Sequence, residues 1–370
     1  MKVKVAITRC DSYNPEPLEK AISQVMESSD FPEVEGKTVL LKPNILYDAP
    51  PERCVTTNPE FLRVFVRLLK KRQPARILVG DSPGMQSKSF CGKACGIWEI
   101  CVEEGLQWVD FTKDTLNVKI PGTKITKPVT SWAQKADVLI SLPKMKTHQL
   151  MYATGGVKNL FGLIPGLNKS QTHLSCPSRQ SFSKLICGLY RFAKPSYCLM
   201  DAVIAMQGAG PANGTPYPAG LILGSTDCPA VDWAQAVLMG YDPNMLPLLT
   251  ELKRQGLLAE QAEYTLLDPY KEKLKGFELI EIREKTKFVR SLVLPFFTSS
   301  IQRAAQKKEP APEFDSSKCI RCCRCVNICP PKALKMQQSG VERDINLCIR
   351  CYCCHEVCPV NAISIPKRSG

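Results

Sequence analysis

Ten of the nineteen cysteines in this 370-residue chain lie between positions 319 and 358, and eight of them follow one spacing twice. Both runs read C-x2-C-x2-C-x3-C-P, the first over residues 319–330 and the second over residues 348–359. This spacing wraps three thiolates around one [4Fe–4S] cluster and sends the fourth thiolate to a neighbouring cluster. We therefore predict two [4Fe–4S] clusters and electron transfer.

The same spacing predicts which thiolate binds which cluster. The first cluster takes Cys319, Cys322, Cys325 and Cys358, and the second takes Cys348, Cys351, Cys354 and Cys329. Two further cysteines, Cys323 and Cys353, lie next to ligands and are not assigned as ligands. Zinc modules favour paired C-x2-C knuckles with a long spacer, and disulfides need an oxidising compartment. An apolar stretch follows each proline, so the two halves form an internal repeat that can pack as a two-fold pair.

The charge of the chain favours anionic ligands. The formal net charge is +14, and two oxidised clusters of about −2 each would leave about +10. Nucleic acid is a less favoured partner, because the basic residues are dispersed and aromatic residues make up only 7%. No apolar run is long enough for a membrane span, and the amino-terminal segment lacks a signal-peptide core. We expect a cytoplasmic protein that works at low oxygen.

Strand and helix patterns alternate through the first two thirds of the chain. Strands are expected at residues 2–8, 37–42, 76–80, 107–111, 136–142, 197–200 and 221–223, and helices at residues 15–28, 58–72, 88–104 and 229–239. Residues 251–284 are charged and are expected to be helical. The alternation predicts an α/β fold with a layered, mostly parallel sheet over residues 1–290, as one domain or two sub-domains. Residues 291–313 would form a tether, and residues 314–370 a small ferredoxin-like α+β module.

Polar residues follow three of the predicted strands, where α/β proteins bind their ligands. We expect them to form one basic pocket with a later Gly-Gly segment, whose amide groups and lysine suit an anion. His148, Lys158 and Asp81 are the candidate catalytic residues. The candidate substrate-binding residues are Lys42, Asn44, Lys144, Lys146, Gly155, Gly156 and Asn159.

Simpler roles exist for several of these residues. Lys42 could end a strand in solvent, Asp81 could cap the following helix, and Lys144 and Lys146 could be ordinary surface charges. For His148, the nearby lysines should lower its pKa and keep it neutral, so that it can act as an acid or base near pH 7. His173 is expected in a polar loop.

The motifs together resemble a known family. Residues 41–44 (Leu-Lys-Pro-Asn), 80–83 (Gly-Asp-Ser-Pro), 142–148 (Leu-Pro-Lys-Met-Lys-Thr-His), 155–160 (Gly-Gly-Val-Lys-Asn-Leu) and the glycines of 208–214 are similar to the domain of unknown function 362, an iron–sulfur-centre family. Residues 348–359 resemble the bacterial two-cluster ferredoxin module that many members carry. The resemblance implies an α/β domain fused to such a module.

A second resemblance concerns the pocket. Lys146 and His148, followed by the Gly-Gly-x-Lys stretch that ends at Lys158, are similar to the amino-terminal domain of the nickel-dependent lactate racemase family. In that family, histidines and a Gly-Gly-x-Lys stretch surround a pincer cofactor. The present chain departs from the pattern because it offers fewer histidines at this place, which puts binding of such a cofactor in doubt.

These observations predict an iron–sulfur oxidoreductase. Electrons from ferredoxin or another carrier would pass through the two clusters to an anionic substrate or cofactor in the basic pocket. Two alternatives remain open. The chain could be an electron-transfer subunit that docks on a larger redox enzyme, or a non-redox isomerase or ligand sensor with structural clusters. No flavin motif is visible, and an organic cofactor is left open.

Overall fold

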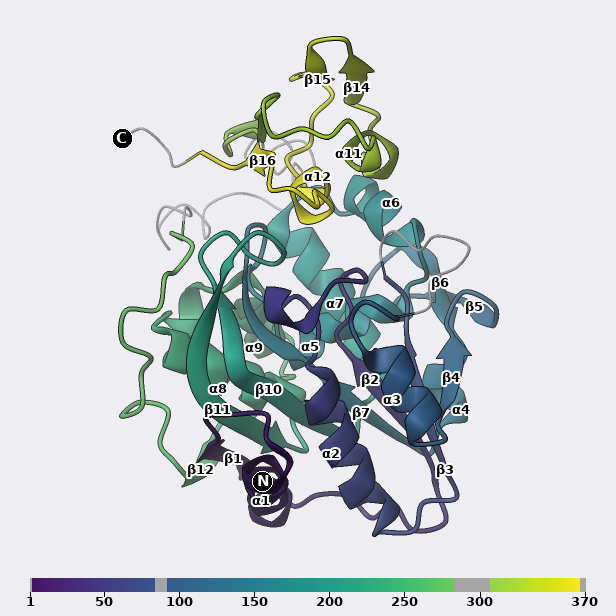
Figure 1. Ribbon diagram of the computed structural model, residues 1–370, viewed down its shortest axis with the longest axis vertical. Coiled ribbons are helices and arrows are strands. Elements are labelled where there is room, and N and C mark those ends of the chain that lie inside the picture. The colour runs from purple at the N-terminus through teal and green to yellow at the C-terminus, as the bar shows by residue number, and fades with distance from the viewer. Residues whose placement is uncertain (1, 84–91, 283–306, 367–370) are drawn as a thin grey trace.

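The computed structural model describes residues 2–83, 92–282 and 307–366. A large α/β body carries the cysteine-rich module at one end (Figure 1). The central sheet has ten strands, eight of them in the order β12-β1-β11-β10-β7-β2-β3-β4, with β8 and β9 joined at β10. Its neighbours pair in parallel except where β11 meets β1 and β10 and where β8 meets β9. The predicted α/β class with a mostly parallel sheet is confirmed.

The strands of the sheet are β1 (Val3–Arg9), β2 (Thr38–Pro43), β3 (Arg76–Asp81), β4 (Gln107–Asp110), β7 (Val138–Leu142), β8 (Lys144–His148), β9 (Tyr152–Ala153), β10 (Tyr197–Gln207), β11 (Thr215–Ser225) and β12 (Ala262–Leu266). A separate hairpin joins β5 (Thr115–Lys119) to β6 (Thr126–Thr130). The α-helices of the body are α1 (Pro15–Ser28), α2 (Pro59–Lys70), α3 (Ile97–Glu103), α4 (Trp132–Lys135), α5 (Gly156–Asn159), α6 (Asn168–Ser175), α7 (Arg179–Ala193), α8 (Cys228–Met239) and α9 (Pro247–Arg254). The described residues of the body also form three 3-10 turns: η1 (Pro51–Arg53), η2 (Leu160–Leu163) and η3 (Pro243–Met245).

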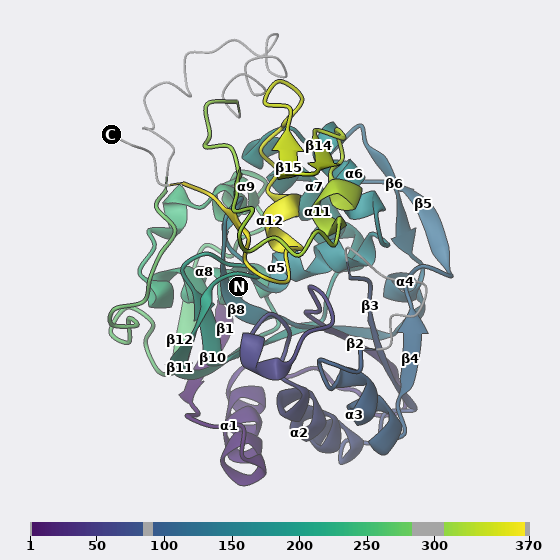
Figure 2. The same ribbon diagram turned by 45° about the horizontal axis from the view of Figure 1, so that its top comes forward.

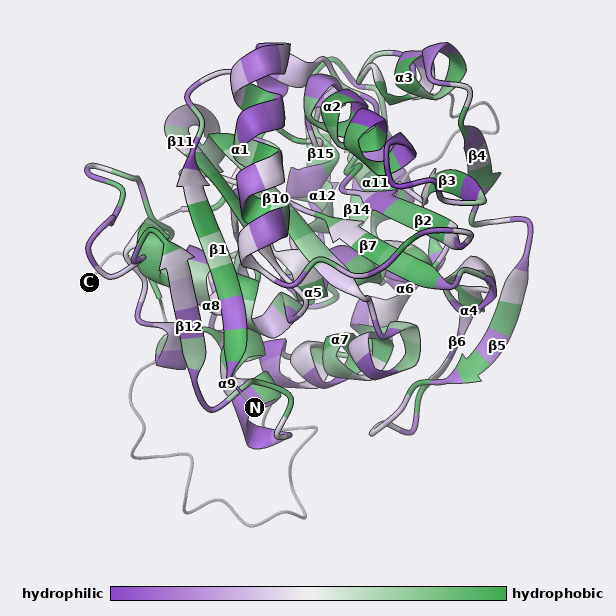
Figure 3. Cartoon of the chain, turned by 90° about the horizontal axis from the view of Figure 1, so that it is seen from below, coloured by the Kyte–Doolittle hydropathy of each residue, from purple (hydrophilic) through white to green (hydrophobic). Residues whose placement is uncertain are grey.

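Helices cover both faces of the sheet, as Figure 3 shows from below. Val39 and Leu41 of β2 point into a core with α1, α2 and α3, whereas Leu40 between them points into the core formed with α7, α8 and α9. Alternate residues of a strand face opposite sides of a sheet, so a strand buried on both sides needs a continuous apolar run. This is why β2 and β7 were recognisable as parallel strands.

Some predicted elements differ from the structure. The helix expected at residues 88–104 begins only at Ile97, and residues 84–91 lie outside the described ranges. Of the stretch 251–284, residues 255–282 are not helical, which makes that prediction wrong, and residues 283 and 284 lie outside the described ranges. Strand β12 lies there instead, because its register places it along β1 at the edge of the sheet. The strands expected at 197–200 and 221–223 are the buried centres of the two long strands β10 and β11.

The module has the predicted internal repeat. Its strands pair as β13 (Glu313–Phe314) with β16 (Ile363–Ser364) and β14 (Leu334–Gln337) with β15 (Gly340–Arg343). Its short helices, α11 (Arg324–Ile328) and α12 (Cys353–Glu356), occupy matching places in the two halves. Left-handed backbone recurs at matching positions, in Arg321, Cys323 and Lys332 of the first half and in Arg350, Tyr352 and Asn361 of the second.

The module packs on the body through its second half. Tyr352 lies within the larger core of the body, and its hydroxyl donates to Pro310 O at 3.0 Å. The Asn213 amide, in the loop after β10, donates to His355 O at 3.0 Å. Figure 2 shows α11 and α12 lying over α5 and α7. Of the predicted tether, residues 291–306 lie outside the described ranges, and the remainder passes along this contact, where Arg179 pairs with Glu309 at 3.0 Å.

Candidate active site between the sheet and the module

Two small cavities inside the module bring the predicted cluster ligands together. Cys319, Cys322, Cys325 and Cys358 line one of them, and Cys329, Cys348, Cys351 and Cys354 line the other. The fourth cysteine of each motif therefore crosses to the other half, as the spacing predicts. Backbone N–H groups donate to the sulfurs at matching places, from Ala333 to Cys329 at 3.3 Å and from Ala362 to Cys358 at 3.2 Å. This donor set fits a [4Fe–4S] cluster in each cavity.

The electrostatics of the two cavities call for a metal centre. The pKa of Cys325 is raised to about 11, mainly by burial and in smaller part by the charges of Cys319, Cys322 and Cys358. Burial likewise raises the pKa of Cys329 to about 11, with further contributions from Cys351 and Cys348. Four thiolates cannot share so small a space without a compensating positive charge, and iron supplies it when a cluster binds.

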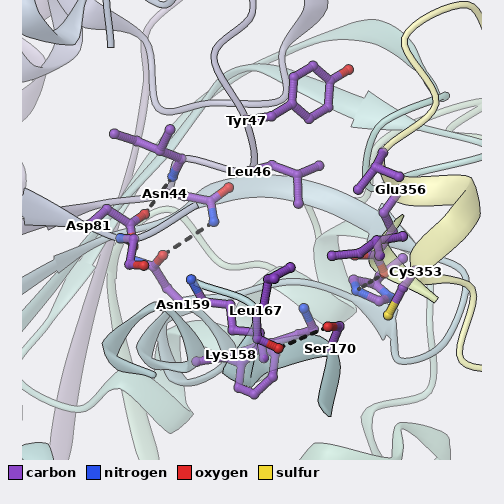
Figure 4. Close-up of a pocket in the computed structure, with 18 of the residues that line it drawn as sticks. Asn44, Leu46, Tyr47, Asp81, Lys158, Asn159, Leu167, Ser170, Cys353 and Glu356 are labelled. Carbon is purple, nitrogen blue, oxygen red and sulfur yellow. Dashed lines mark hydrogen bonds and ion pairs between the residues drawn. The ribbon is translucent and has the colours of Figure 1, made fainter. Parts of the chain in front are cut away.

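A cavity of about 460 Å³ lies between the body and the module (Figure 4). The loops after β2 and β3, the end of β8, and helices α5 and α6 provide its walls on the side of the body. It is large enough for a small organic molecule. Of the predicted site residues, it brings together Lys42, Asn44, Asp81, His148, Lys158 and Asn159.

The module closes this cavity with the same face of both of its helices. Helix α11 contributes Arg324, Asn327 and Ile328, and α12 contributes Cys353 and Glu356 together with Val357, the residue that follows the helix. These two sets occupy matching positions, since each begins one residue before the third cysteine of its motif. Arg324 also lines the cavity of the first cluster, and Cys353 also lines that of the second. Each cluster site is therefore separated from the large cavity by one residue layer.

Lys42 forms a buried polar knot at the end of β2. The residue is 0% exposed, and its ammonium group donates to Asp81 Oδ1 at 2.8 Å, Pro43 O at 3.1 Å and Asn159 Oδ1 at 3.2 Å. All three ammonium protons are used, so Lys42 has none left for a ligand. Burial lowers the pKa of Lys42, while the charge of Asp81 opposes this effect.

Two neighbours complete the knot. The second oxygen of Asp81 accepts from Ile45 N at 2.8 Å, which fixes the start of the loop after β2. Gly162 packs directly against the pair, and a side chain there would overlap both Asp81 Oδ1 and Lys42 Nζ. The side-chain amide of Asn44 donates from Nδ2 to Asn159 Oδ1 at 3.3 Å. Its side-chain oxygen Oδ1 is buried and has no hydrogen-bond partner within residues 2–83, 92–282 and 307–366. That oxygen is open to a hydrogen-bond donor on a ligand.

The opposite wall carries cations without partners. The charged groups of Lys158, Lys169 and Arg324 form no hydrogen bond or ion pair with any residue that the structure describes. Burial lowers the pKa of Lys158, and it lowers the pKa of Lys169 to about 7. Unpaired cations in a half-buried cavity attract an anionic ligand, which would restore their ordinary protonation.

His148 is held as a neutral imidazole. Its Nδ1 accepts from the N–H groups of Leu150 at 3.1 Å and Met151 at 3.3 Å, so Nε2 carries the proton. Nε2 lies 3.4 Å from Glu356 Oε1 of the module. Burial lowers the pKa of His148 well below its ordinary value, with smaller effects from Lys158 and Lys146. The predicted effect of the lysines on this pKa is confirmed, although burial is the larger cause.

Four predicted substrate-binding residues do not line the cavity. Lys144 is buried elsewhere, where it donates to Asp201 Oδ2 at 2.8 Å and to the Tyr13 hydroxyl at 2.6 Å. Lys146 donates to Val55 O at 2.7 Å. Neither lysine is an ordinary surface charge, because both are almost completely buried.

The Gly-Gly segment binds an anion that belongs to the protein itself. The N–H groups of Gly156 and Val157 donate to the carboxylate of Asp232 at 2.5 and 3.1 Å. A side chain at Gly155 would overlap this carboxylate. Burial raises the pKa of Asp232 to about 7, and the two N–H groups oppose the shift. Gly155 and Gly156 thus anchor α5, which carries Lys158, to α8.

The structure adds cavity residues that the sequence did not single out. They include Lys169, Ser170 and His173, which line the cavity from α6, so the segment expected as a polar loop is a helix. From the module come Asn327 and Glu356. The signal for the second pair was present in the repeated motif, because both residues follow a third cysteine at the same distance.

A sequence profile of the family described as "domain of unknown function (DUF362)" matches residues 39–237, more than half of the chain. The chain belongs to this family. A second profile, the "4Fe-4S binding domain", matches residues 312–335 and 341–364. With the eight cysteines gathered into two cavities, these matches show that this DUF362 protein carries two [4Fe–4S] clusters.

Relatives of this DUF362 protein share its sequence or its fold in part. A thylakoid-associated protein of Synechocystis is 28% identical over 270 residues, which is 72% of this chain and 83% of that protein. The lactate racemase apoprotein from Thermoanaerobacterium thermosaccharolyticum has a TM-score of 0.43 at 13% identity, over 64% of this chain and 57% of that chain. A protein from Thermotoga maritima has a TM-score of 0.36 at 12% identity, over 56% of this chain and 55% of that chain. Both solved structures are thus matched over less than two thirds of their length.

Across the described residues, no helix has the length and apolar character that crossing a bilayer requires.

Proposed function

We propose that this protein is an iron–sulfur oxidoreductase that passes electrons through its two clusters to an anionic substrate or cofactor in the cavity between body and module. The observation that carries the proposal is the pair of matching helix faces on α11 and α12. They place both cluster sites next to one cavity. A cavity that both halves of the module help to build favours a reaction there over a function as an electron-transfer subunit alone.

The clusters supply one electron each when bound, so together they can support a two-electron reduction. We assign the ligands as the spacing predicts, with Cys358 and Cys329 crossing between the halves. The electrons would come from ferredoxin or a similar carrier in the cytoplasm. The body and module then act as one unit, in which the module closes the cavity and delivers the electrons.

The cations of the cavity bind the substrate in this proposal. Lys158 and Lys169 hold its anionic group, and Arg324 approaches it from the module. Asn44 accepts a hydrogen bond from a donor on the substrate. Asp81 is a positioning residue, because it contacts Lys42 and the backbone rather than the open part of the cavity.

Protons come from groups whose pKa matches neutral pH. Lys169, whose pKa is lowered to about 7 in the empty protein, takes up a proton from solvent when the anionic substrate binds and can release it to the reduced substrate. His148 stays neutral, and its Nε2–H donates a hydrogen bond to the reacting group or to Glu356. It therefore orients and polarises rather than shuttling a full proton, because its protonated form is strongly disfavoured in this buried place.

The reaction can be tested with chemically reduced protein. Anaerobic protein with reduced clusters is mixed with a panel of 2-oxo acids and 2-enoates, and cluster reoxidation is followed by its absorbance. We expect at least one compound to accelerate reoxidation, and Lys158→Met to remove most of the acceleration. Lys119→Met, an exposed lysine on β5, is the matched control and should behave like the wild type. Unchanged acceleration in a His148→Ala/Lys158→Met double variant would reject the cavity as the reaction site.

The ligand assignment has its own test. Cys325→Ser should lower the iron and acid-labile sulfide content by about half, since it removes a ligand of one cluster. Cys323→Ser is the matched control two positions away and should retain the full content. Equal loss in both variants would contradict the assignment.

A further inference from the structure

The two halves of the module differ in what covers them. Ile320, Arg321 and Cys322 of the first half occupy the positions that Ile349, Arg350 and Cys351 occupy in the second. In the second half, this face is already a contact surface. Ile349 and Cys351 line a crevice with His173, Cys176 and Ser178 of the body.

Arg350 shows how completely the second half is covered. It is only 7% exposed and donates to Glu309 O at 3.2 Å and to Cys348 O at 2.8 Å. An apolar residue, an arginine and a cluster ligand thus meet a protein surface at this place.

The same three positions are open in the first half. Ile320 is 60% exposed, Arg321 and Cys322 are exposed, and Arg321 donates to Gln338 O of its own half. In Figure 1 the first half lies farther from the body, whereas α12 of the second half lies against it. An exposed isoleucine beside an exposed cluster ligand is an apolar surface that a partner can cover.

The charge of this surface selects the partner. Residues 315–327 contain the cations Lys318, Arg321 and Arg324 and a single acidic residue, Asp315, which pairs with Lys318 at 2.8 Å, so Arg321 and Arg324 give this stretch its positive charge. A surface with this charge attracts an acidic protein and speeds its association. Because electron transfer requires short distances, the carrier that reduces the first cluster must approach it where a ligand is exposed, and Cys322 is such a ligand.

We propose that Ile320, Arg321 and Cys322 form the docking surface for an acidic one-electron carrier protein that reduces the first cluster. This inference rests on the proposed redox function. One electron leaves the carrier and enters the first cluster, so the carrier is oxidised and the cluster reduced by one electron, and no covalent bond is formed or broken. Electrons enter at the open face of the first half and leave at the cavity.

The test compares protein-driven with chemical reduction of the clusters. Anaerobic stopped-flow mixing follows their bleaching by a reduced acidic [2Fe–2S] ferredoxin, and in a second series by the methyl viologen radical cation. Arg321→Glu should slow the ferredoxin reaction at least about tenfold at low salt, because charge reversal removes the steering. Reduction by viologen should not be slowed. Lys335→Glu on β14, the same charge change at another exposed place, is the matched control and should retain most of the ferredoxin rate.

Binding gives a second readout that does not depend on turnover. Calorimetric titration of the oxidised protein with oxidised ferredoxin should show weaker binding for Arg321→Glu and for Ile320→Ser than for Lys335→Glu. Equal effects of Arg321→Glu and Lys335→Glu on rate and affinity would overturn the docking surface. Substrate-driven reoxidation of chemically reduced Arg321→Glu protein is expected to stay at the wild-type rate. Failure of the docking surface and failure of the proposed function therefore give different results.

Discussion

The two walls of the large cavity treat charge in opposite ways. At the sheet wall, formed by Lys42, Asp81 and Asn159, every charged group has a partner and the lysine is 0% exposed. At the helix wall, formed by Lys158, Lys169 and Arg324, the described residues provide no partner for the cations. Both walls contain lysines near the ends of strands or helices. Residue type alone therefore does not show which wall has paired charges and which has unpaired ones.

The difference indicates which wall binds the ligand. A buried ion pair fixes backbone geometry but offers no free hydrogen-bond donors. Removing one partner leaves the other charge buried and uncompensated, which destabilises the protein. Lys158 and Lys169 are partly buried, and cations held there without a hydrogen-bonded or ion-paired partner cost free energy in the empty protein. Such local conflicts are typical of functional sites. We infer that the sheet wall shapes the cavity and the helix wall binds.

The largest effect is expected from breaking the sheet wall. Asp81→Ala leaves Lys42 buried without its carboxylate, which should lower the free energy of unfolding by about 3–5 kcal/mol. Chemical denaturation under anaerobic conditions measures this change. The double variant Lys42→Met/Asp81→Leu removes both charges and should recover at least part of the loss. A cost of less than about 1 kcal/mol for Asp81→Ala would show that the pair does not hold this wall together.

A smaller loss should follow from crowding the same pair. Gly162→Ala places a methyl group against Asp81 Oδ1 and Lys42 Nζ, which must separate to admit it. Overpacking of this kind costs about 1–3 kcal/mol. The control is a double-mutant cycle, in which the effect of Gly162→Ala should shrink once Asp81 is already alanine. An undiminished effect in that background would mean that the clash lies elsewhere.

The iron–sulfur module was predictable because most ligands of each cluster lie close together in the sequence at a characteristic spacing. Three ligands of each cluster lie within seven consecutive residues, for example Cys319 to Cys325, so chain geometry alone brings them together. The α/β class was predictable for a similar reason, since the continuous apolar runs of β2 and β7 are local signals. The strand β12 was missed because it lies at a sheet edge within a charged stretch of the sequence, and only its pairing with β1 makes it a strand.

The cavity could be predicted only in part. Its position followed from the strand ends, but which lysine is free depends on partners far away in the sequence. Lys144 is taken by Asp201, and the Gly155–Gly156 segment by Asp232. The sequence around Lys144 and around the Gly155–Gly156 segment does not indicate that these distant carboxylates are their partners. The residues from the module were hidden for a further reason, since their approach to the body is a matter of tertiary packing.

The helix wall should respond in binding rather than in stability. Lys169→Met should weaken the binding of sulfate, a probe for the cation site, by about tenfold, because one charged hydrogen bond is lost. Its free energy of unfolding should stay the same or rise, since an unpaired buried charge is removed. Calorimetric titration with sulfate measures the affinity, with Lys119→Met as the exposed-lysine control. Loss of stability without loss of affinity would assign Lys169 to the structure and not to binding.

The smallest effect is the dependence of this binding on pH. Burial lowers the pKa of Lys169 from 10.5 to about 7 in the empty protein, so it is protonated below pH 7 and increasingly neutral above it. Sulfate keeps its charge in this range, and its affinity should therefore be highest below pH 7 and fall above it by at most about tenfold in total, which is the loss expected for Lys169→Met. The pKa of Lys146 is also lowered to about 7. Because Lys146 does not line the cavity, its protonation should affect sulfate binding more weakly than that of Lys169. His148 does not contribute, because it is already neutral.

The sign for stability is opposite to that for binding. The unfolded chain keeps the Lys169 proton up to about pH 10.5, whereas the folded protein releases it near pH 7, so the contribution of this lysine to stability rises with pH between these values. Lys169→Met should flatten both profiles, and the dependence that remains should come from other groups whose pKa is shifted by burial, among them Lys146 and Lys158. At the sheet wall, all three ammonium protons of Lys42 are already used in hydrogen bonds within the protein. The double variant Lys42→Met/Asp81→Leu should therefore leave the pH dependence of sulfate binding unchanged. A pH profile that follows the sheet wall instead would reverse the division of the cavity into a shaping and a binding side.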